Sequence, residues 1–344
     1  MKSLTLILST ILLTICSADL LVGQETTDKS GTTAAQFLKI GVGAQAMGVG
    51  GAFVAATDDV YSLYWNPAGI TKVSRVTFAG AYTQWFADIT HQFFGLVLPI
   101  DGSSAVGFHA IFLNIDPIEI TTIDRPHGTG EFFDANDLAV GVSYARRLTN
   151  LFAMGITGKY LQQSIYNESA GTFAFDIGSL LDVPWWGIKL GMHFSNFGGK
   201  LQLDGRDLIR EFDMNPNNTT NIGVETRLQT EPWELPINFR VGLAADVMGG
   251  EESPMDSEIN RLSISIDGNH PVDSPEFINL GVEYSYQDLV TARFGYRMKP
   301  DNSKLFYGAG LKMPISDAFL TVDYALASYD ELDYINIISM CISF

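Results

Sequence analysis

Cysteine, charge and long apolar runs are all scarce in this chain of 344 residues. There are two cysteines, Cys16 and Cys341, and only the second remains if an N-terminal leader is removed, which excludes an intramolecular disulfide scaffold. Charged residues make up 17%, below the roughly 25% that is usual in soluble domains. Lys and Arg number 21 against 39 Asp and Glu, and the resulting charge of −18 argues against nucleic acid as a partner.

The first 24 residues are predicted to be a cleaved secretory signal. Lys2 supplies the positive start, an apolar run covers residues 4–15, and small or polar residues follow. This run is shorter than the roughly 20 residues that a membrane-spanning helix needs. Residues 40–57 are uncharged but contain five glycines, which disfavour a helix. Without a helical span, an exported chain is either a soluble protein or a β-barrel.

Period-two alternation fills the chain from Arg75 to Phe344 and decides between these two classes. In residues 278–286, for example, large apolar side chains alternate with Asn, Gly, Glu and Ser. A soluble β protein would expose a more highly charged second face. Large residues against lipid and small ones against a lumen are typical of a membrane barrel. We therefore predict a transmembrane antiparallel β-barrel of about 14 strands over residues 73–344, with outer-membrane lipid around it.

The links between the expected strands differ in length. Short links occur at Asn150 and at residues 287–288, as expected for turns on one side of the membrane. Longer polar insertions around 116–135, 198–218, 248–259 and 267–275 are predicted to be loops on the other side.

Two segments precede the barrel. Residues 25–33 are polar and are predicted to be disordered. Residues 34–72 are rich in Gly and Ala and are predicted to plug the lumen, because a barrel of this size needs something to fill it. Within them, Thr57 as an N-cap with Asp58 and Asp59 in the first turn predicts a short helix over 58–65, stopped by Pro67. This role explains the two carboxylates better than a catalytic pair does.

Charged residues on the small-residue face form a second set of candidates. Because both signs occur together, a lumenal salt-bridge network is favoured over a polar track for a ligand. The set comprises Arg240, Asp246, Asp267, Glu283, Arg293, Arg297 and Asp323.

Motifs for catalysis, cofactors or metals are absent or fail in context. The Gly41–Ala46 run superficially matches a dinucleotide-binding motif, but glycines at 48, 50 and 51 interrupt the helix that should follow. The five histidines form no compact ligand set, and there is no Gly-x-Ser-x-Gly elbow. The glycosylation sequons at Asn167 and Asn218 are taken as accidental in a bacterial-type exported barrel. We expect no enzymatic activity, no cofactor and no metal.

A family resemblance adds to this interpretation. The run from Gly41 to Ala55, with Asp58-Asp59 and Tyr64-Trp65-Asn66-Pro67-Ala68-Gly69, resembles the N-terminal region of the PorV/PorQ family of outer-membrane proteins. The Asn-Pro-Ala-Gly element is also similar to the FadL-type transporters of hydrophobic compounds. Later pieces agree: Ser143-Tyr144-Ala145, Phe175-Asp176-Ile177-Gly178, Ser195-Asn196-Phe197-Gly198, Leu235-Pro236, His270-Pro271, Gly281-Val282-Glu283-Tyr284 and the terminal Ile342-Ser343-Phe344.

The resemblance implies a 14-stranded FadL-like barrel in the outer membrane of a Gram-negative bacterium. It implies a role in protein export as a type IX secretion shuttle, with the translocon and cargo signal domains as partners and extracellular loops as the binding surface. The alternative is a FadL-like channel with a hydrophobic small molecule in its lumen, in which Phe53, Tyr61, Tyr64 and Trp65 would line an apolar pocket. Core packing of these aromatics remains an equal alternative.

Overall fold

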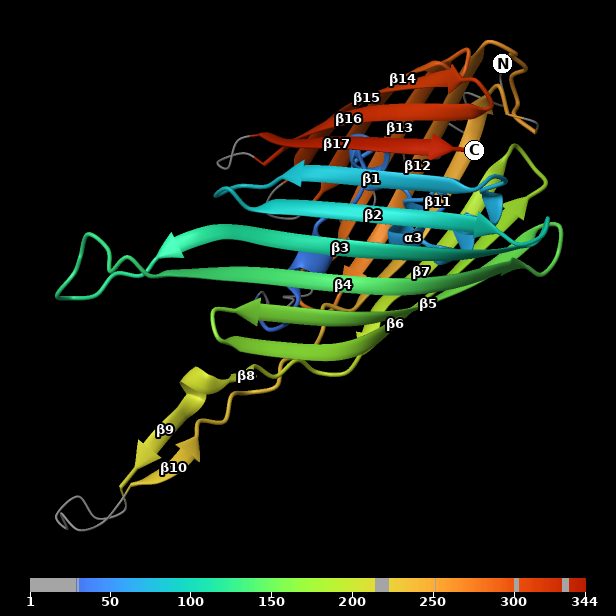
Figure 1. Cartoon of the computed structure of the whole chain (residues 1–344). Coiled ribbons are helices and arrows are strands. Elements are labelled where there is room, and N and C mark those ends of the chain that lie inside the picture. Colours follow the sequence, from blue (N-terminus) through green and yellow to red (C-terminus); the bar gives the residue numbers. More distant parts are fainter. Residues whose placement is uncertain (1–28, 30, 214–222, 251, 300–302, 330–333) are drawn as a thin grey trace, which may run out of the picture.

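The computed structural model describes residues 29, 31–213, 223–250, 252–299, 303–329 and 334–344, and the predicted signal lies outside them. Fourteen antiparallel strands close into a barrel, which confirms the predicted class and strand number (Figure 1). Consecutive barrel strands pair, β7 pairs with β11, and β1 closes the ring with β17. The barrel strands are β1 (Thr77–Gln84), β2 (Thr90–Pro99), β3 (Ser104–Glu119), β4 (Phe132–Arg147), β5 (Phe152–Ile165), β6 (Glu168–Val183), β7 (Ile188–Gly198), β11 (Asn238–Met248), β12 (Asn260–Pro271), β13 (Phe277–Tyr286), β14 (Val290–Met298), β15 (Lys304–Ile315), β16 (Ala318–Ser328) and β17 (Tyr334–Ser343).

The two faces of each strand follow the predicted alternation. On β13, Ile278, Val282 and Tyr284 are exposed on the outside, whereas Asn279 and Gly281 are buried on the inside. The same outward belt of large apolar side chains continues around the ring. Because such a surface would be costly in water, it fits the acyl-chain layer of a membrane. Among the described residues, no helix is both long enough and apolar enough to cross a bilayer.

The barrel has two unlike ends. We call the end where β1 begins and β17 finishes the terminal end, and the opposite one the loop end. The loop end carries the β3–β4 link and the long β7–β11 link, which holds β8 (Asp204–Gly205), η4 (Arg206–Leu208), β9 (Ile209–Phe212) and β10 (Val224–Arg227). The β9–β10 hairpin projects beyond the barrel (Figure 1).

One predicted loop lies at the wrong end. Residues 249–259 link β11 to β12 at the terminal end, because β11 starts after the long loop-end link and runs back across the barrel. The described parts of the other long insertions, 116–135, 198–213 and 267–275, do lie at the loop end, although 116–119, 132–135 and 267–271 belong to strands β3, β4 and β12. Length alone therefore did not identify the side, whereas the short turns at Asn150 and Gln287 share the terminal end as expected.

Residues 34–72 contain short helical pieces: η2 (Gln36–Lys39), α2 (Ala44–Gly48), α3 (Ser62–Trp65) and η3 (Pro67–Lys72). The helix expected over 58–65 is shorter and Thr57 is not its N-cap, because the Thr57 hydroxyl hydrogen-bonds to the Ser62 hydroxyl instead. The helix does end before Pro67, where Asn66 adopts the extended conformation that a following proline favours.

Candidate functional site

The inner segment, residues 33–72, runs through the barrel from one end to the other. At the loop end, Thr33 bridges to Glu234 in the β7–β11 link. Helix α2 then packs against β14, β15, β16 and β17, and η3 packs against β3 to β6. At the terminal end, Lys72 pairs with Asp182 of β6 at 3.0 Å. Thr33, expected in the disordered stretch, therefore belongs to the packed part.

Lumen-facing glycines let the inner segment approach the wall closely. At several of them, an added Cβ would lie closer to the inner segment than real Cβ atoms come. The pairs are Gly95 with Val60, Gly107 with Leu63, Gly155 with Pro67, Gly191 with Val54, Gly281 with Val49 and Gly295 with Gly50. The lumen-facing side chains at these positions are thus absent because the backbone and side chains of the inner segment take up the space.

Asp273, in the β12–β13 link, anchors the inner segment at the loop end. Its carboxylate accepts hydrogen bonds from Thr33 Oγ1 at 2.5 Å and Gln36 Nε2 at 3.1 Å, and it pairs with Lys39 Nζ at 3.0 Å. Burial alone would raise the pKa of Asp273, but these three partners outweigh burial and hold the pKa below its ordinary value. The carboxylate form is therefore the one that fixes the segment.

We expect Asp273→Asn to lower the free energy of unfolding by about 1.5–3 kcal/mol at pH 7, because a charge-assisted anchor is lost. Since the folded pKa is lowered, the stabilisation is complete above the ordinary Asp value of about 3.9 and fades as the pH falls through the folded value. Urea unfolding in lipid at pH 7 and at pH 3 checks this. The gap between wild type and variant should shrink at pH 3, and an equal gap at both would contradict the anchor.

The four aromatic candidates are held by hydrogen bonds and ring contacts rather than gathered around one pocket. Trp65 Nε1 donates to Val42 O at 2.8 Å, Tyr64 OH to Leu38 O at 2.9 Å and Tyr61 OH to Gly80 O at 3.1 Å. Phe53 packs edge-on against Trp65. Phe53 and Tyr61 are buried in packing, whereas Tyr64 and Trp65 line a cavity at the loop end.

The Asn66-Pro67-Ala68-Gly69 element turns the segment towards the wall. Asn66 Nδ2 donates to Val54 O at 2.9 Å and to Ser179 O of β6 at 3.0 Å, while its Oδ1 caps η3 through Ala68 N. Pro67 takes the first position of η3. A Cβ at Gly69 would lie 2.5 Å from Thr57 Oγ1. Each of these residue types thus has a structural reason here.

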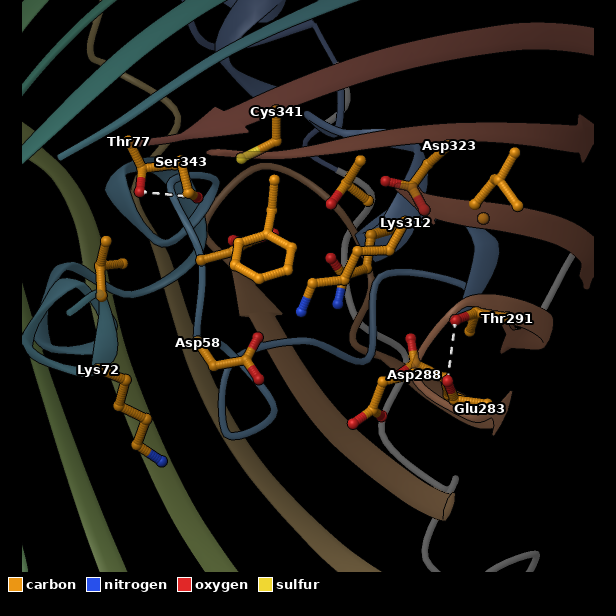
Figure 2. Close-up of a pocket in the computed structure, with 18 of the residues that line it drawn as sticks. Asp58, Lys72, Thr77, Glu283, Asp288, Thr291, Lys312, Asp323, Cys341 and Ser343 are labelled. Atoms are coloured by element: carbon orange, nitrogen blue, oxygen red, sulfur yellow. Dashed lines mark hydrogen bonds between the residues drawn. The ribbon is translucent and has the colours of Figure 1, made fainter. Parts of the chain in front are cut away.

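A cavity of about 400 Å³ opens at the terminal end, with Asp58 on its lining (Figure 2). Asp58 is exposed, whereas Asp59 Oδ1 accepts from Tyr61 N at 2.8 Å. Figure 2 shows Asp58 of the inner segment across the hollow from Lys312 and Glu283 of the wall, with Lys72 at its edge. Acidic and basic groups are mixed around this hollow, so it favours no single ligand charge.

The lumenal charges form separate groups. Arg293 bridges Glu283 and Asp323, at 2.6 Å to each. Asp246 pairs with Lys189 at 3.1 Å and Arg261 at 3.2 Å near the terminal end. Asp267 Oδ2 accepts from the backbone N–H groups of Phe53 and Val54, at 2.8 and 2.9 Å. Arg240 and Arg297 line the loop-end cavity with Tyr64 and Trp65. Most of these charges hold the inner segment or a neighbouring strand.

A buried polar cluster on β5, β6 and β7 was missed from the sequence. Lys159 Nζ lies 2.8 Å from Asp176 Oδ2 and 2.6 Å from Asn196 Oδ1. The β6–β7 register shifts here, and Asn196 adopts a left-handed φ of 64°. The signal that could have revealed it is the pair of motifs Phe175–Gly178 and Ser195–Gly198, which the bulge brings together.

The loop end has two further hollows with largely apolar surroundings. One, of about 450 Å³, lies between Ala34, Leu201 and Trp233, and the other, of about 520 Å³, lies beside Phe37 and Trp85. Ala34, Asp137 and Gln163 line both, so the two hollows adjoin near the start of the inner segment. Between the two ends of the barrel, the inner segment packs against lumen-facing glycines and contributes to the buried core.

Comparisons with known proteins agree with this architecture. The solved structure of the CymD monoaromatic hydrocarbon channel has a TM-score of 0.59 at 12% identity, covering 88% of this chain and 98% of its own. The toluene transporter TbuX of Ralstonia pickettii gives 0.57 at 12%, with 88% and 97% covered. The toluene transporter TodX of Pseudomonas putida gives 0.54 at 11%, with 85% and 96% covered. At these identities they show a shared FadL-like fold.

No curated protein matches the chain. The family model described as type IX secretion system protein PorV matches residues 23–248, which is more than half of the 344 residues. With its closed 14-stranded barrel, this outer-membrane protein belongs to the PorV family.

Proposed function

We propose that this protein is a non-enzymatic accessory of type IX protein export that binds cargo at the loop end, outside the barrel. The observation that carries the proposal is the close packing of the inner segment against glycines around the wall, which a substrate passing through the barrel would have to displace. We therefore assign the binding of cargo to surfaces of the protein that lie outside the lipid layer. Membership of the PorV family supplies the link to secretion.

The loop end carries the long β7–β11 link, which offers exposed apolar residues for such a binding surface. The β9–β10 hairpin presents Phe212 and Val224 opposite each other, 56% and 60% exposed, and Leu228 and Trp233 follow in the same link. Exposed apolar groups on a projecting hairpin fit a protein partner better than water. We infer that this end faces the outside of the cell, because barrels keep short turns and their C-terminus on the periplasmic side.

A gene deletion tests the export role, with the secretome measured by mass spectrometry. Cargo proteins should accumulate in the periplasm of the deletion strain, and the wild-type gene should restore secretion. The double variant Phe212→Ser/Val224→Ser should restore it poorly. The matched control is Ile100→Ser, because Ile100 is 61% exposed in the β2–β3 link at the terminal end. Normal secretion in the deletion strain would overturn the proposal.

The second candidate function is a channel for hydrophobic small molecules. The two largely apolar hollows at the loop end favour it, together with the fold shared with structures described as hydrocarbon channels. Passage would require the inner segment to move away from the glycines. Loss of uptake of a hydrophobic carbon source in the deletion strain, with secretion intact, would select this function over export.

A further inference from the structure

The cavity at the loop end that Tyr64 and Trp65 line is unusual in its charge. Its volume is about 140 Å³, and its lining also includes Leu38, Arg240 and Arg297. The chain as a whole carries a formal charge of −18, yet two guanidinium groups meet here. Such a concentration of positive charge in an acidic protein needs a physical explanation.

Arg240 is 8% exposed and forms no salt bridge among the described residues, and the nearby carboxylate of Asp267 on β12 accepts from Phe53 N and Val54 N instead. Its guanidinium carbon lies 5.0 Å from the Trp65 ring and 5.5 Å from the Tyr64 ring. Nε and Nη1 are shielded from water and have no hydrogen-bond partner in the described part of the chain. Ring contacts attract the cation but do not accept its in-plane N–H groups. Since Nε and Nη1 are inaccessible, the remaining nitrogen, Nη2, is the one that a counter-charge in the cavity can approach.

The second guanidinium, that of Arg297, has neutral partners. Its Nε donates to Asn279 Oδ1 at 3.0 Å and its Nη2 to Gly50 O at 3.3 Å. The acid on the cavity wall, Asp273, already accepts from Lys39, Thr33 and Gln36. By contrast, Arg293 on the same barrel lies between two carboxylates. Among the described residues, Arg240 and Arg297 therefore bring positive charge to the loop-end cavity that no carboxylate bridges.

We propose that this cavity binds a small organic carboxylate, with Arg240 as the principal contact. A carboxylate accepts a charge-assisted hydrogen bond from a guanidinium nitrogen, and Trp65, Tyr64 and Leu38 offer apolar surface for the rest of the molecule. The volume is several times the roughly 30 Å³ share of one water molecule but below the usual range for drug-sized ligands. A single-ring acid such as benzoate is of suitable size. This inference does not depend on the export role.

Isothermal titration of benzoate into the purified full-length barrel in detergent tests the site. Wild type should bind benzoate and should bind neutral benzamide at least tenfold more weakly. Arg240→Gln should weaken benzoate binding at least tenfold, which is about 1.4 kcal/mol. The matched control is Lys200→Gln, because Lys200 is a cation of the β7–β11 link that pairs with Glu234 on the exposed surface. Lys200→Gln should bind benzoate with the affinity of wild type. Its titration also shows how much heat comes from benzoate partitioning into the detergent micelles.

Heat-modifiable migration on a gel verifies that each variant is folded. If Arg240→Gln does not fold, the comparison of benzoate with benzamide on wild type decides, supported by Arg240→Lys, which keeps the charge but not the planar donor set. Equal affinity for benzoate and benzamide, no binding of either, or undiminished binding to folded Arg240→Gln would overturn the proposal.

Discussion

Gly295→Val is expected to destabilise the barrel by more than about 3 kcal/mol, or to prevent the inner segment from packing at all. A Cβ at position 295 of β14 would lie 2.0 Å from the backbone nitrogen of Gly50 and 2.4 Å from the carbonyl carbon of Val49. Gly50 has a φ of 71°, so the segment makes its close approach in a conformation that favours glycine. Because the obstacle is backbone, it cannot rotate away as a flexible side chain could, so the strain exceeds the roughly 1–3 kcal/mol usual for an overpacked core.

The control for this substitution is Gly268→Val on β12. Gly268 is exposed on the outer side, and a Cβ there would lie 3.9 Å from its nearest neighbour, Val241 O. Unfolding in urea, followed in lipid bilayers, should give a near-normal free energy for Gly268→Val and a large loss for Gly295→Val. If both variants unfold like wild type, the inner segment does not pack against this wall, and the proposal that it fills the lumen is wrong.

These glycines also indicate how far the sequence alone can lead. The alternation of large and small side chains predicted the barrel, because period two and the chemistry of each face are local properties. It also placed Arg240, Asp267 and Arg293 on the inner face. The sequence did not predict what each of them contacts, because the contacts are long-range. Asp267 accepts hydrogen bonds from the backbone N–H groups of Phe53 and Val54, more than 200 residues away in the chain.

The parts that local rules missed were decided by tertiary contacts. The sequence pattern predicted Thr57 as a helix N-cap, but in the folded chain its hydroxyl hydrogen-bonds to the Ser62 hydroxyl. The length of the 249–259 link suggested a loop-end position, whereas the number of preceding crossings decides the side. The Lys159–Asp176–Asn196 cluster depends on a β-bulge between β6 and β7. Because the apolar–polar alternation continues on both sides of the bulge, the sequence pattern did not reveal it.

Arg293→Met is expected to lower the free energy of unfolding by about 3–5 kcal/mol. Removing the guanidinium leaves Asp323, whose side chain is 3% exposed, without its counter-ion, and also frees Glu283. The uncompensated buried charge, rather than the lost attraction itself, dominates the cost. Urea unfolding in bilayers at pH 7 measures the loss.

Burial, not distance, should govern this effect, and the chain offers a matched pair to separate the two. Arg227 lies 2.6 Å from Asp204, the same separation as Arg293 from Asp323, but its side chain is 57% exposed. Arg227→Met should therefore cost no more than about 1 kcal/mol. The triple variant Arg293→Met/Glu283→Gln/Asp323→Asn should recover most of the stability, because no charge is then left unpaired. If the triple variant is as unstable as Arg293→Met alone, the loss comes from packing around the arginine stem, and the charge argument for the lumen fails.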